Sequence, residues 1–171
     1  MELRSGTSPP VQPQIRDIAA LAPCDKPVTI GPRPSGGPPM TEDSVLDAAV
    51  VVIDSIAALE ASDAGAIVVT GSHGGVSAAV YAMSVPIRGV VFNDAGLGKD
   101  AAGIAALGRL DAAGVPALAV SHESARIGDA GDTLRSGIVS HVNHEAARRG
   151  VAPGQTTQEA VRRLAEKALI C

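Results

Sequence analysis

The sequence predicts an α/β fold, a three-layer sandwich around a mostly parallel sheet of four or five strands, Rossmann-like or flavodoxin-like in type. The main observation is that three apolar runs, residues 66–70, 89–92 and 116–120, each end in polar residues and precede a helical pattern. Strands that alternate with helices form parallel sheets with right-handed crossovers. In such sheets ligands bind outside the carboxyl ends of the strands, so the loops after these runs predict the site.

The chain begins with a segment whose composition differs from the rest. Residues 1–40 hold nine of the twelve prolines. Proline removes backbone donors, so we expect residues 1–42 to form an extended Pro/Gly-rich N-terminal arm, with residues 15–21 as one or two helical turns within it. Residues 43–171 then form a single α/β domain, which is long enough for one core without disulfides or metals.

The first strand of the domain is ambiguous from the pattern. Residues 49–53 are mostly β-branched and predict a strand, after which Ser55 caps a short helix that runs to Ala61. The alternative is a single helix across residues 43–60, because Asp43-Ser44 is also a helix-capping sequence. Periodicity does not separate the two, and we favour the strand.

Turn signals predict two helices between the later strands. Gly74-Gly75 lets the chain turn tightly into a helix over residues 76–83. A second helix over residues 101–113 carries one apolar stripe and ends at Gly114, where glycine commonly follows a helix.

The next helix is predicted over residues 132–149, with Asp132 as its N-cap and Gly150 as its stop. Its apolar stripe, at positions i, i+4 and i+8, consists of Leu134, Ile138 and Val142. On this helix His141 is expected at the boundary of the stripe, and His144 nearly opposite it in solvent.

The last helix has a clear start signal. Thr156-Thr157-Gln158-Glu159 is a capping box. The buried face of the helix that follows is expected to consist of Val161, Leu164, Ala165, Ala168 and Leu169.

Composition excludes several classes of function. The formal charge of −4 and pI near 5.5 predict no nucleic-acid partner, which would need clustered Lys and Arg. No apolar run approaches the roughly 20 residues that span a bilayer, and Cys24 and Cys171 show no metal or disulfide spacing, so we expect no membrane partner and a cytoplasmic location. The aromatic content is 1%, and a core of small aliphatic residues favours a homo-oligomer.

The first candidate loop is Gly71-Ser72-His73-Gly74-Gly75. Backbone N–H groups in a glycine-rich turn before a helix favour an anion or a developing oxyanion, here at Gly74 and Gly75, with Ser72 beside them. His73 can exchange a proton near neutral pH. The loop lacks the GxGxxG pattern, so a dinucleotide cofactor is not predicted.

The second candidate loop contains Asn93, Asp94 and Lys99. Asp94 is a candidate base or ligand, while Asn93 and Lys99 could hold a substrate, Lys99 through a carboxylate. Gly98-Lys99 resembles part of a phosphate-binding P-loop, but that pattern requires Gly at Asn93 and Ser or Thr at Asp100. ATP or GTP hydrolysis is therefore not predicted.

The third candidate loop is the richest in polar groups. Ser121, His122, Glu123 and Arg126 follow the strand at residues 116–120. A histidine and a carboxylate can supply a base and the group that orients it, and an arginine can bind a substrate carboxylate.

Two further chemistries are weaker. A Ser-His-Asp triad built on Ser72 or Ser121 lacks the GxSxG spacing of a nucleophile elbow. A divalent metal could use imidazole and carboxylate ligands from three strand ends, namely His73, Asp94, His122 and Glu123. No spacing such as HExxH supports that set, so no cofactor is predicted and a divalent metal stays an alternative.

These residues together predict a small-molecule enzyme that acts on a small anionic substrate. His73 or His122 serves as general acid/base, and Asp94 or Glu123 orients it. We favour hydrolysis of an amide or related C–N bond in a carboxylate-bearing substrate. The alternatives are a lyase or isomerase acting next to a carboxylate, a non-catalytic anion-binding or regulatory subunit, and a purely structural role in oligomerisation.

Overall fold

The computed structural model describes residues 48–166, so the expected arm at residues 1–42 lies outside the described residues. They form one five-stranded sheet with the spatial order β1-β2-β3-β4-β5. Its strands are β1 (Val50–Ile53), β2 (Ile67–His73), β3 (Gly89–Asn93), β4 (Ala117–Val120) and β5 (Val139–Val142). Strands β1 to β4 are parallel, and β5 pairs with β4 in the antiparallel direction. The predicted α/β class and mostly parallel five-stranded sheet are confirmed.

Helical segments connect the strands and follow the last one. They are the 3-10 helices η2 (Ile56–Ala58), η3 (Ala61–Asp63) and η4 (Lys99–Ile104), and the α-helices α1 (Val76–Ala82), α2 (Ala105–Ala112), α3 (Ala130–Ser136), α4 (His144–Ala147) and α5 (Thr157–Ala165). Among residues 48–166 no helix has the length and apolar character needed to cross a bilayer.

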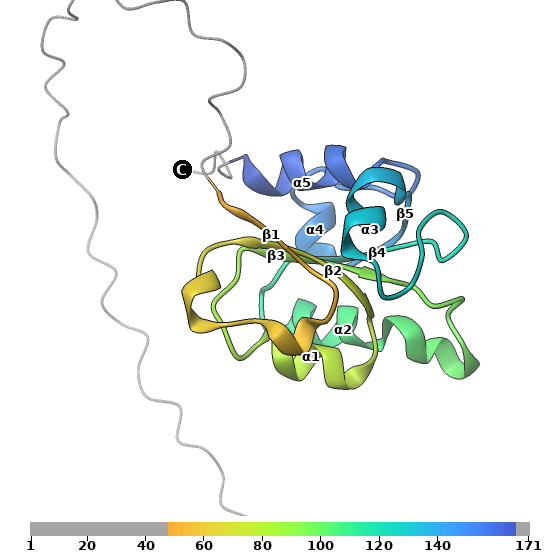
Figure 1. Ribbon diagram of the computed structural model, residues 1–171, viewed down its shortest axis with the longest axis horizontal. Helices are drawn as coiled ribbons and strands as arrows, with labels where there is room; N and C mark the ends of the chain where they lie inside the picture. Colours follow the sequence, from red (N-terminus) through yellow and green to blue (C-terminus); the bar gives the residue numbers. More distant parts are fainter. Residues whose placement is uncertain (1–47, 167–171) are drawn as a thin grey trace, which may run out of the picture. The chain divides into compact units, whose positions relative to one another are not determined.

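Helices cover both faces of the sheet (Figure 1). Crossovers between parallel strands are right-handed. When each new strand is added on the same side of the previous one, the crossovers therefore all lie on one face of the sheet. Accordingly η2, α1 and α2 pack in one core with Val68, Val90 and Phe92. Helix α5, together with residues of α3 and α4, covers the other face over Ile67 and Leu118. The sheet is therefore the middle of three layers.

The strand order differs from both expected fold types. In Rossmann-like and flavodoxin-like sheets the order in which strands are added reverses at one point, and a crevice opens there. Here the order follows the sequence from β1 to β5 without a reversal. The carboxyl ends of the parallel strands still share one edge, and the loops that follow them are the ones predicted to hold the site.

The region after β1 is close to the prediction. Residues 50–53 are a strand, and the Ser55 hydroxyl accepts the Ala57 N–H at the start of η2. The expected helix to Ala61 is instead two short 3-10 helices, η2 and η3. Leu59 separates them with extended backbone.

The helix predicted over residues 132–149 is wrong. The chain instead forms α3, β5 and α4, and the N-cap of α3 is Asp129, whose side chain accepts the Asp132 N–H. Gly137 ends α3 where an added Cβ would lie 2.4 Å from the Thr133 carbonyl oxygen. Of the predicted stripe, Leu134 of α3 and Val142 of β5 pack against the same core from different elements, whereas Ile138 is 38% exposed.

The two other long helices are nearer the prediction. Helix α2 begins at Ala105 rather than Ala101, because residues 99–104 form η4. Helix α5 has the predicted capping box, with the Thr156 side chain accepting the Glu159 N–H. Two residues of its expected buried face, Ala168 and Leu169, lie outside the described residues.

Candidate functional site

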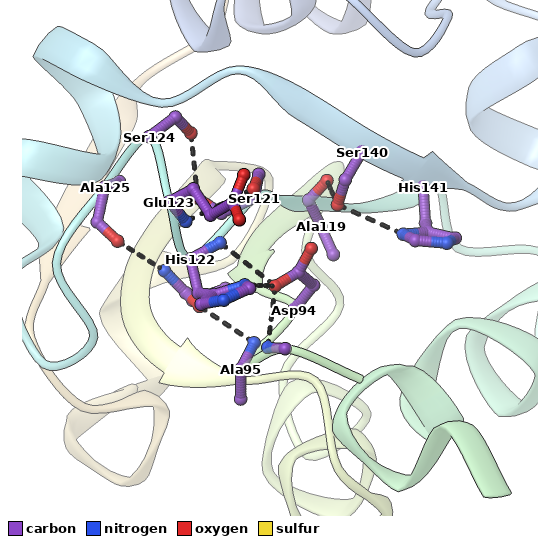
Figure 2. A network of polar contacts seen from close by, with 12 residues as sticks. Asp94, Ala95, Ala119, Ser121, His122, Glu123, Ser124, Ala125, Ser140 and His141 are labelled. Carbon is purple, nitrogen blue, oxygen red and sulfur yellow. Dashed lines mark hydrogen bonds and ion pairs between the residues drawn. The ribbon is translucent and has the colours of Figure 1, made fainter. Parts of the chain in front are cut away.

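The carboxyl ends of β3 and β4 bring Asp94 and His122 together. Asp94 directly follows β3, and His122 follows β4 by two residues. The strands are parallel neighbours with Asn93 opposite Val120, so both loops leave the sheet at the same edge. The Nδ1 atom of His122 lies 3.0 Å from Oδ1 of Asp94 (Figure 2). Two of the predicted catalytic residues thus form a hydrogen-bonded pair.

Asp94 is only 5% exposed, and its carboxyl is surrounded by donors. Its Oδ1 accepts the Gly96 N–H at 2.9 Å and the His122 N–H at 3.0 Å. Burial alone would raise the pKa of this carboxyl, but these hydrogen bonds, with those from the Ser140 hydroxyl and the His122 ring, outweigh burial and lower the pKa below its ordinary value of 3.8. Asp94 is therefore ionised at neutral pH.

This carboxylate determines which nitrogen of His122 carries the proton. An ionised carboxylate can only accept hydrogen bonds, so Nδ1 of His122 donates and the lone pair of the neutral ring is on Nε2. The His122 side chain is 45% exposed, and Nε2 has no hydrogen bond to any of residues 48–166. Nε2 can therefore accept a proton from a ligand or a water molecule.

A bulge in β5 lies beside this pair. Ala119 of β4 pairs with His141 and Val120 pairs with Val139, so Ser140 is an extra residue in β5. Such bulges redirect a side chain and are frequent beside active sites. Ser140 is not among the site residues predicted from the sequence, because the bulge depends on the pairing of β5 with β4.

The bulge continues the polar network away from His122. The Ser140 hydroxyl donates to the Ala119 carbonyl oxygen at 3.2 Å and lies 3.1 Å from Nδ1 of His141. It is also one of the groups that lower the pKa of Asp94. Because the hydroxyl proton is donated to the carbonyl oxygen, the hydroxyl oxygen is free to accept from His141. Figure 2 shows His122 and His141 on opposite sides of Asp94.

The glycine-rich loop after β2 is arranged differently from the prediction. The Gly74 N–H donates to the Asn93 carbonyl oxygen at 3.1 Å, and the Gly75 N–H donates to Nδ1 of His73 at 3.0 Å. Both donors expected to stabilise an oxyanion are thus used within the chain. Because Nδ1 of His73 accepts a hydrogen bond, the proton of the neutral ring is on Nε2, and His73 presents a donor at the exposed end of β2.

Asn93 joins two of the predicted loops but does not face solvent. It is fully buried, its Nδ2 donates to the Ala125 carbonyl oxygen at 2.9 Å, and its Oδ1 accepts the Ala95 N–H at 2.9 Å. These bonds hold the loop after β3 against the loop after β4. Asn93 is therefore placed to support the site rather than to contact a ligand.

The two predicted serines also bind backbone groups. Ser72 Oγ accepts the Ile56 N–H at 3.0 Å, which fixes the start of η2. Ser121 Oγ accepts the Glu123 N–H at 3.2 Å, which closes a turn after β4. Within the described part of the chain neither hydroxyl is hydrogen-bonded to a histidine ring.

Three predicted residues are exposed charges. Arg126 lies 3.9 Å from the Asp129 carboxylate, with its own side chain 79% exposed. The side chains of Lys99 and Glu123 form no hydrogen bond or ion pair with residues 48–166. All three follow strands at the edge that holds the pair, and none is fixed in position by a strong contact.

The loop between β3 and α2 has an unusual backbone. Left-handed φ angles from 50° to 66° occur at four residues other than glycine, namely Ala95, Leu97, Asp100 and Ala101. Each costs about 1–2 kcal/mol, so surrounding contacts must hold them. One such contact is at Gly103, whose N–H donates to the Leu97 carbonyl oxygen at 2.7 Å and where a Cβ would lie 2.3 Å from the Asp94 carbonyl oxygen. The strain is thus concentrated next to Asp94.

The alternative metal set is not gathered into one shell. Within residues 48–166 no three His, Cys, Asp or Glu side chains are grouped as ligands of one ion. Of the four candidates, Asp94 and His122 bind each other, whereas His73 binds the Gly75 N–H. We therefore derive no step through a metal ion.

No protein-family model, curated protein or solved structure matches this chain. Function is therefore inferred from the geometry of the site. The central feature of that geometry is a buried, ionised Asp94 that fixes the proton of an exposed His122.

Proposed function

We propose that this protein is a small-molecule enzyme in which His122 is the general base. The single observation that carries the proposal is the 3.0 Å contact between Nδ1 of His122 and the buried Asp94 carboxylate. This contact keeps the lone pair on Nε2 and stabilises the imidazolium that forms when Nε2 takes a proton. General-base catalysis of this kind typically contributes about 10²–10⁴ to a rate.

The favoured reaction is hydrolysis of an amide or related C–N bond in a carboxylate-bearing substrate. His122 takes a proton from a water molecule, the water oxygen attacks the carbonyl carbon, and the C–N bond breaks as the imidazolium returns the proton to nitrogen. No serine hydroxyl is hydrogen-bonded to Nε2 among the described residues, which favours water over a hydroxyl side chain as the nucleophile. The Nε2–H of His73 replaces the Gly74 and Gly75 N–H groups as the donor to the developing oxyanion.

Lys99 and Arg126 are the proposed partners of the substrate carboxylate. Both are exposed cations on the loops that leave β3 and β4. Because neither is locked in a strong ion pair, each can reorganise around an anion. Glu123 is left as a weaker candidate to orient a histidine, since Asp94 already has that role.

A sharp test uses His122→Asn, because the Asn side-chain nitrogen can still donate to Asp94 while the base is lost. The protein is assayed against a panel of carboxylate-bearing amides and ureides, with Gln158→Ala on the exposed side of α5 as the control. We expect His122→Asn to lower kcat/KM by about a thousandfold and the control to leave it unchanged. A kcat/KM that His122→Asn leaves unchanged would contradict the proposal.

The same assay separates the alternatives. Hydrolysis in ¹⁸O-labelled water places the label in the product, whereas the reaction of a lyase or isomerase that acts next to a carboxylate does not require incorporation of the label. Ligands that bind without turnover, and that still bind after His73 and His122 are replaced separately, would favour an anion-binding or regulatory subunit.

We also propose a cytoplasmic homo-oligomer. The apolar side chains of Val76 and Val80 on α1 are about half exposed, as is Tyr81. An exposed apolar helix face favours association. Light scattering of the full chain tests the homo-oligomer. Val80→Glu should lower the mass of the assembly, and a wild-type chain that is monomeric at all concentrations would refute the oligomer.

A further inference from the structure

A groove lies where α2 meets the edge strand β5, and His122 is not among the residues that line it. It has a volume of about 650 Å³ and runs between η4 and α2 on one side and β5 and α4 on the other. That volume is in the range of small-molecule sites. His141, the far end of the network from His122, forms part of its wall.

The lining is mostly aliphatic, with two carboxylates and two imidazoles. Ile104, Leu107 and Val142 contribute apolar surface, and His141 and His144 contribute the imidazoles, while no Phe, Tyr or Trp lines the groove among the described residues. Its acidic residues are Asp100 and Asp111, and the described residues that line it include no lysine or arginine.

Both carboxylates have lone pairs left for a ligand, because each Asp111 oxygen accepts only one hydrogen bond, from His144 or from the Glu145 N–H. The hydrogen bond from His144, 2.9 Å away, is the main reason that the pKa of Asp111 lies below its ordinary 3.8, and the Glu145 N–H at 3.1 Å adds to it, so Asp111 is ionised at neutral pH. The Asp100 carboxylate is exposed and forms no hydrogen bond or ion pair with residues 48–166. Its backbone is left-handed, with φ of 55°.

The two acidic residues lie near opposite ends of α2 in the chain. Asp100 precedes α2, and Asp111 is in its last turn. Ala105, where α2 begins, and Asp111 are about 9 Å apart along the helix axis, at 1.5 Å per residue, and Asp100 lies before Ala105 in the chain. An alkyl chain along the aliphatic wall can therefore place a positive group near one carboxylate or near each of them.

We propose that this groove binds an aliphatic amine, with the alkyl chain against Ile104 and Leu107 and its ammonium groups at Asp111 and Asp100. Two carboxylates without a lysine or arginine in the described lining disfavour an anion, and that lining has no Phe, Tyr or Trp on which a planar aromatic ligand could stack. A bare metal ion is disfavoured because no three ligating side chains gather within residues 48–166. The site does not depend on the chemistry of His122.

Calorimetric titration of the full chain with the diamine cadaverine tests the proposal. Pentanediol serves as the uncharged ligand of the same chain length. Asp111→Asn removes one charge but keeps an acceptor for the Glu145 N–H, and Asp100→Asn keeps a side chain that tolerates the left-handed backbone. Gly108→Leu fills the groove without a change of charge, at a helical position where an added Cβ meets nothing within 4 Å. Glu166→Gln, at the exposed end of α5, removes the same charge elsewhere.

We expect saturable binding of cadaverine and none of pentanediol. Asp111→Asn should weaken binding by about fivefold, and Asp100→Asn by less because that carboxylate is more exposed. Gly108→Leu should abolish binding while the thermal midpoint stays the same or rises, since Gly is unfavourable within a helix. Glu166→Gln should leave the affinity unchanged.

Three results would overturn the proposal. They are no saturable binding of cadaverine by the wild-type chain, equal loss in Glu166→Gln and Asp111→Asn, or full binding by a folded Gly108→Leu variant. The second would mean that the amine binds the acidic surface in general. None of these measurements uses turnover, so they are independent of the proposed enzyme activity.

Discussion

His73 and His122 occupy equivalent places in the fold yet hold their protons in opposite ways. Each follows or ends a parallel strand at the same edge of the sheet. Nδ1 of His73 accepts the Gly75 N–H, whereas Nδ1 of His122 donates to the Asp94 carboxylate. The neutral His73 ring therefore presents a donor at Nε2, and the His122 ring presents a lone pair. The partner of Nδ1, rather than the position of the histidine, decides which ring is suited to act as a base.

The largest expected effect comes from removing the charge that orients His122. Asp94→Asn keeps an acceptor for the Gly96 N–H but no longer requires His122 to carry its proton on Nδ1. We expect kcat/KM to fall by about a thousandfold, close to the loss from His122→Asn itself. Long-range ¹H–¹⁵N correlation spectra should show only the Nδ1–H form of His122 in the wild-type chain and both ring forms in Asp94→Asn. If Asp94→Asn also shows only the Nδ1–H form, the carboxylate does not decide where the proton lies.

The same variant should change how stability depends on pH. The folded-state pKa of Asp94 is below its ordinary 3.8, so its ionised form stabilises the fold fully above that value. The stabilisation is lost as the pH falls through the lower folded-state pKa. Urea titrations should find Asp94→Asn less stable than the wild type at pH 7, with a gap that narrows below about pH 3.8. A gap independent of pH would show that the carboxylate charge is not the stabilising feature.

A smaller effect is expected at His73, because it offers a hydrogen-bond donor rather than a base. His73→Ala should lower kcat by about a hundredfold, a typical loss for one oxyanion donor. His73→Gln should restore part of the activity, since its amide can donate from a similar place. Equal losses in the two variants would show that His73 acts as a base as well.

Gly75→Ala is the matched perturbation of that ring. An added Cβ at Gly75 would lie 2.7 Å from the His73 imidazole, so the ring must move although no functional group is removed. Activity between those of the wild type and His73→Ala would locate the donor at the observed ring position. Wild-type activity in Gly75→Ala would place the role of His73 elsewhere.

The smallest effect is expected at Ser140, which acts through Asp94. Ser140→Ala removes one of the hydrogen bonds that lower the Asp94 pKa, so that pKa should rise towards 3.8. Carbon NMR of the labelled carboxyl group measures this shift directly. Activity should fall by no more than about tenfold, as is usual for a residue behind the reacting groups. An unchanged Asp94 pKa would remove Ser140 from the site.

Local signals in the sequence were sufficient for most of the scaffold. The β-branched and apolar runs predicted the four parallel strands, and the capping box at Thr156 predicted the start of α5. The loop positions of Asp94 and His122 followed from the same rule, because parallel strands share a carboxyl edge. Each of these depends on neighbours within a few positions of one another.

Tertiary structure decided the rest. Residues 132–149 contain a spacing that suits a helix, yet residues 139–142 gain more as a strand because the edge of β4 supplies backbone partners that a local pattern does not contain. That pairing creates the bulge at Ser140 and completes the network behind Asp94. The ring forms of His73 and His122 depend in the same way on which donor or acceptor the fold places 3.0 Å from Nδ1. The sequence by itself determined which groups reach the edge of the sheet, and only the fold decided where their protons lie.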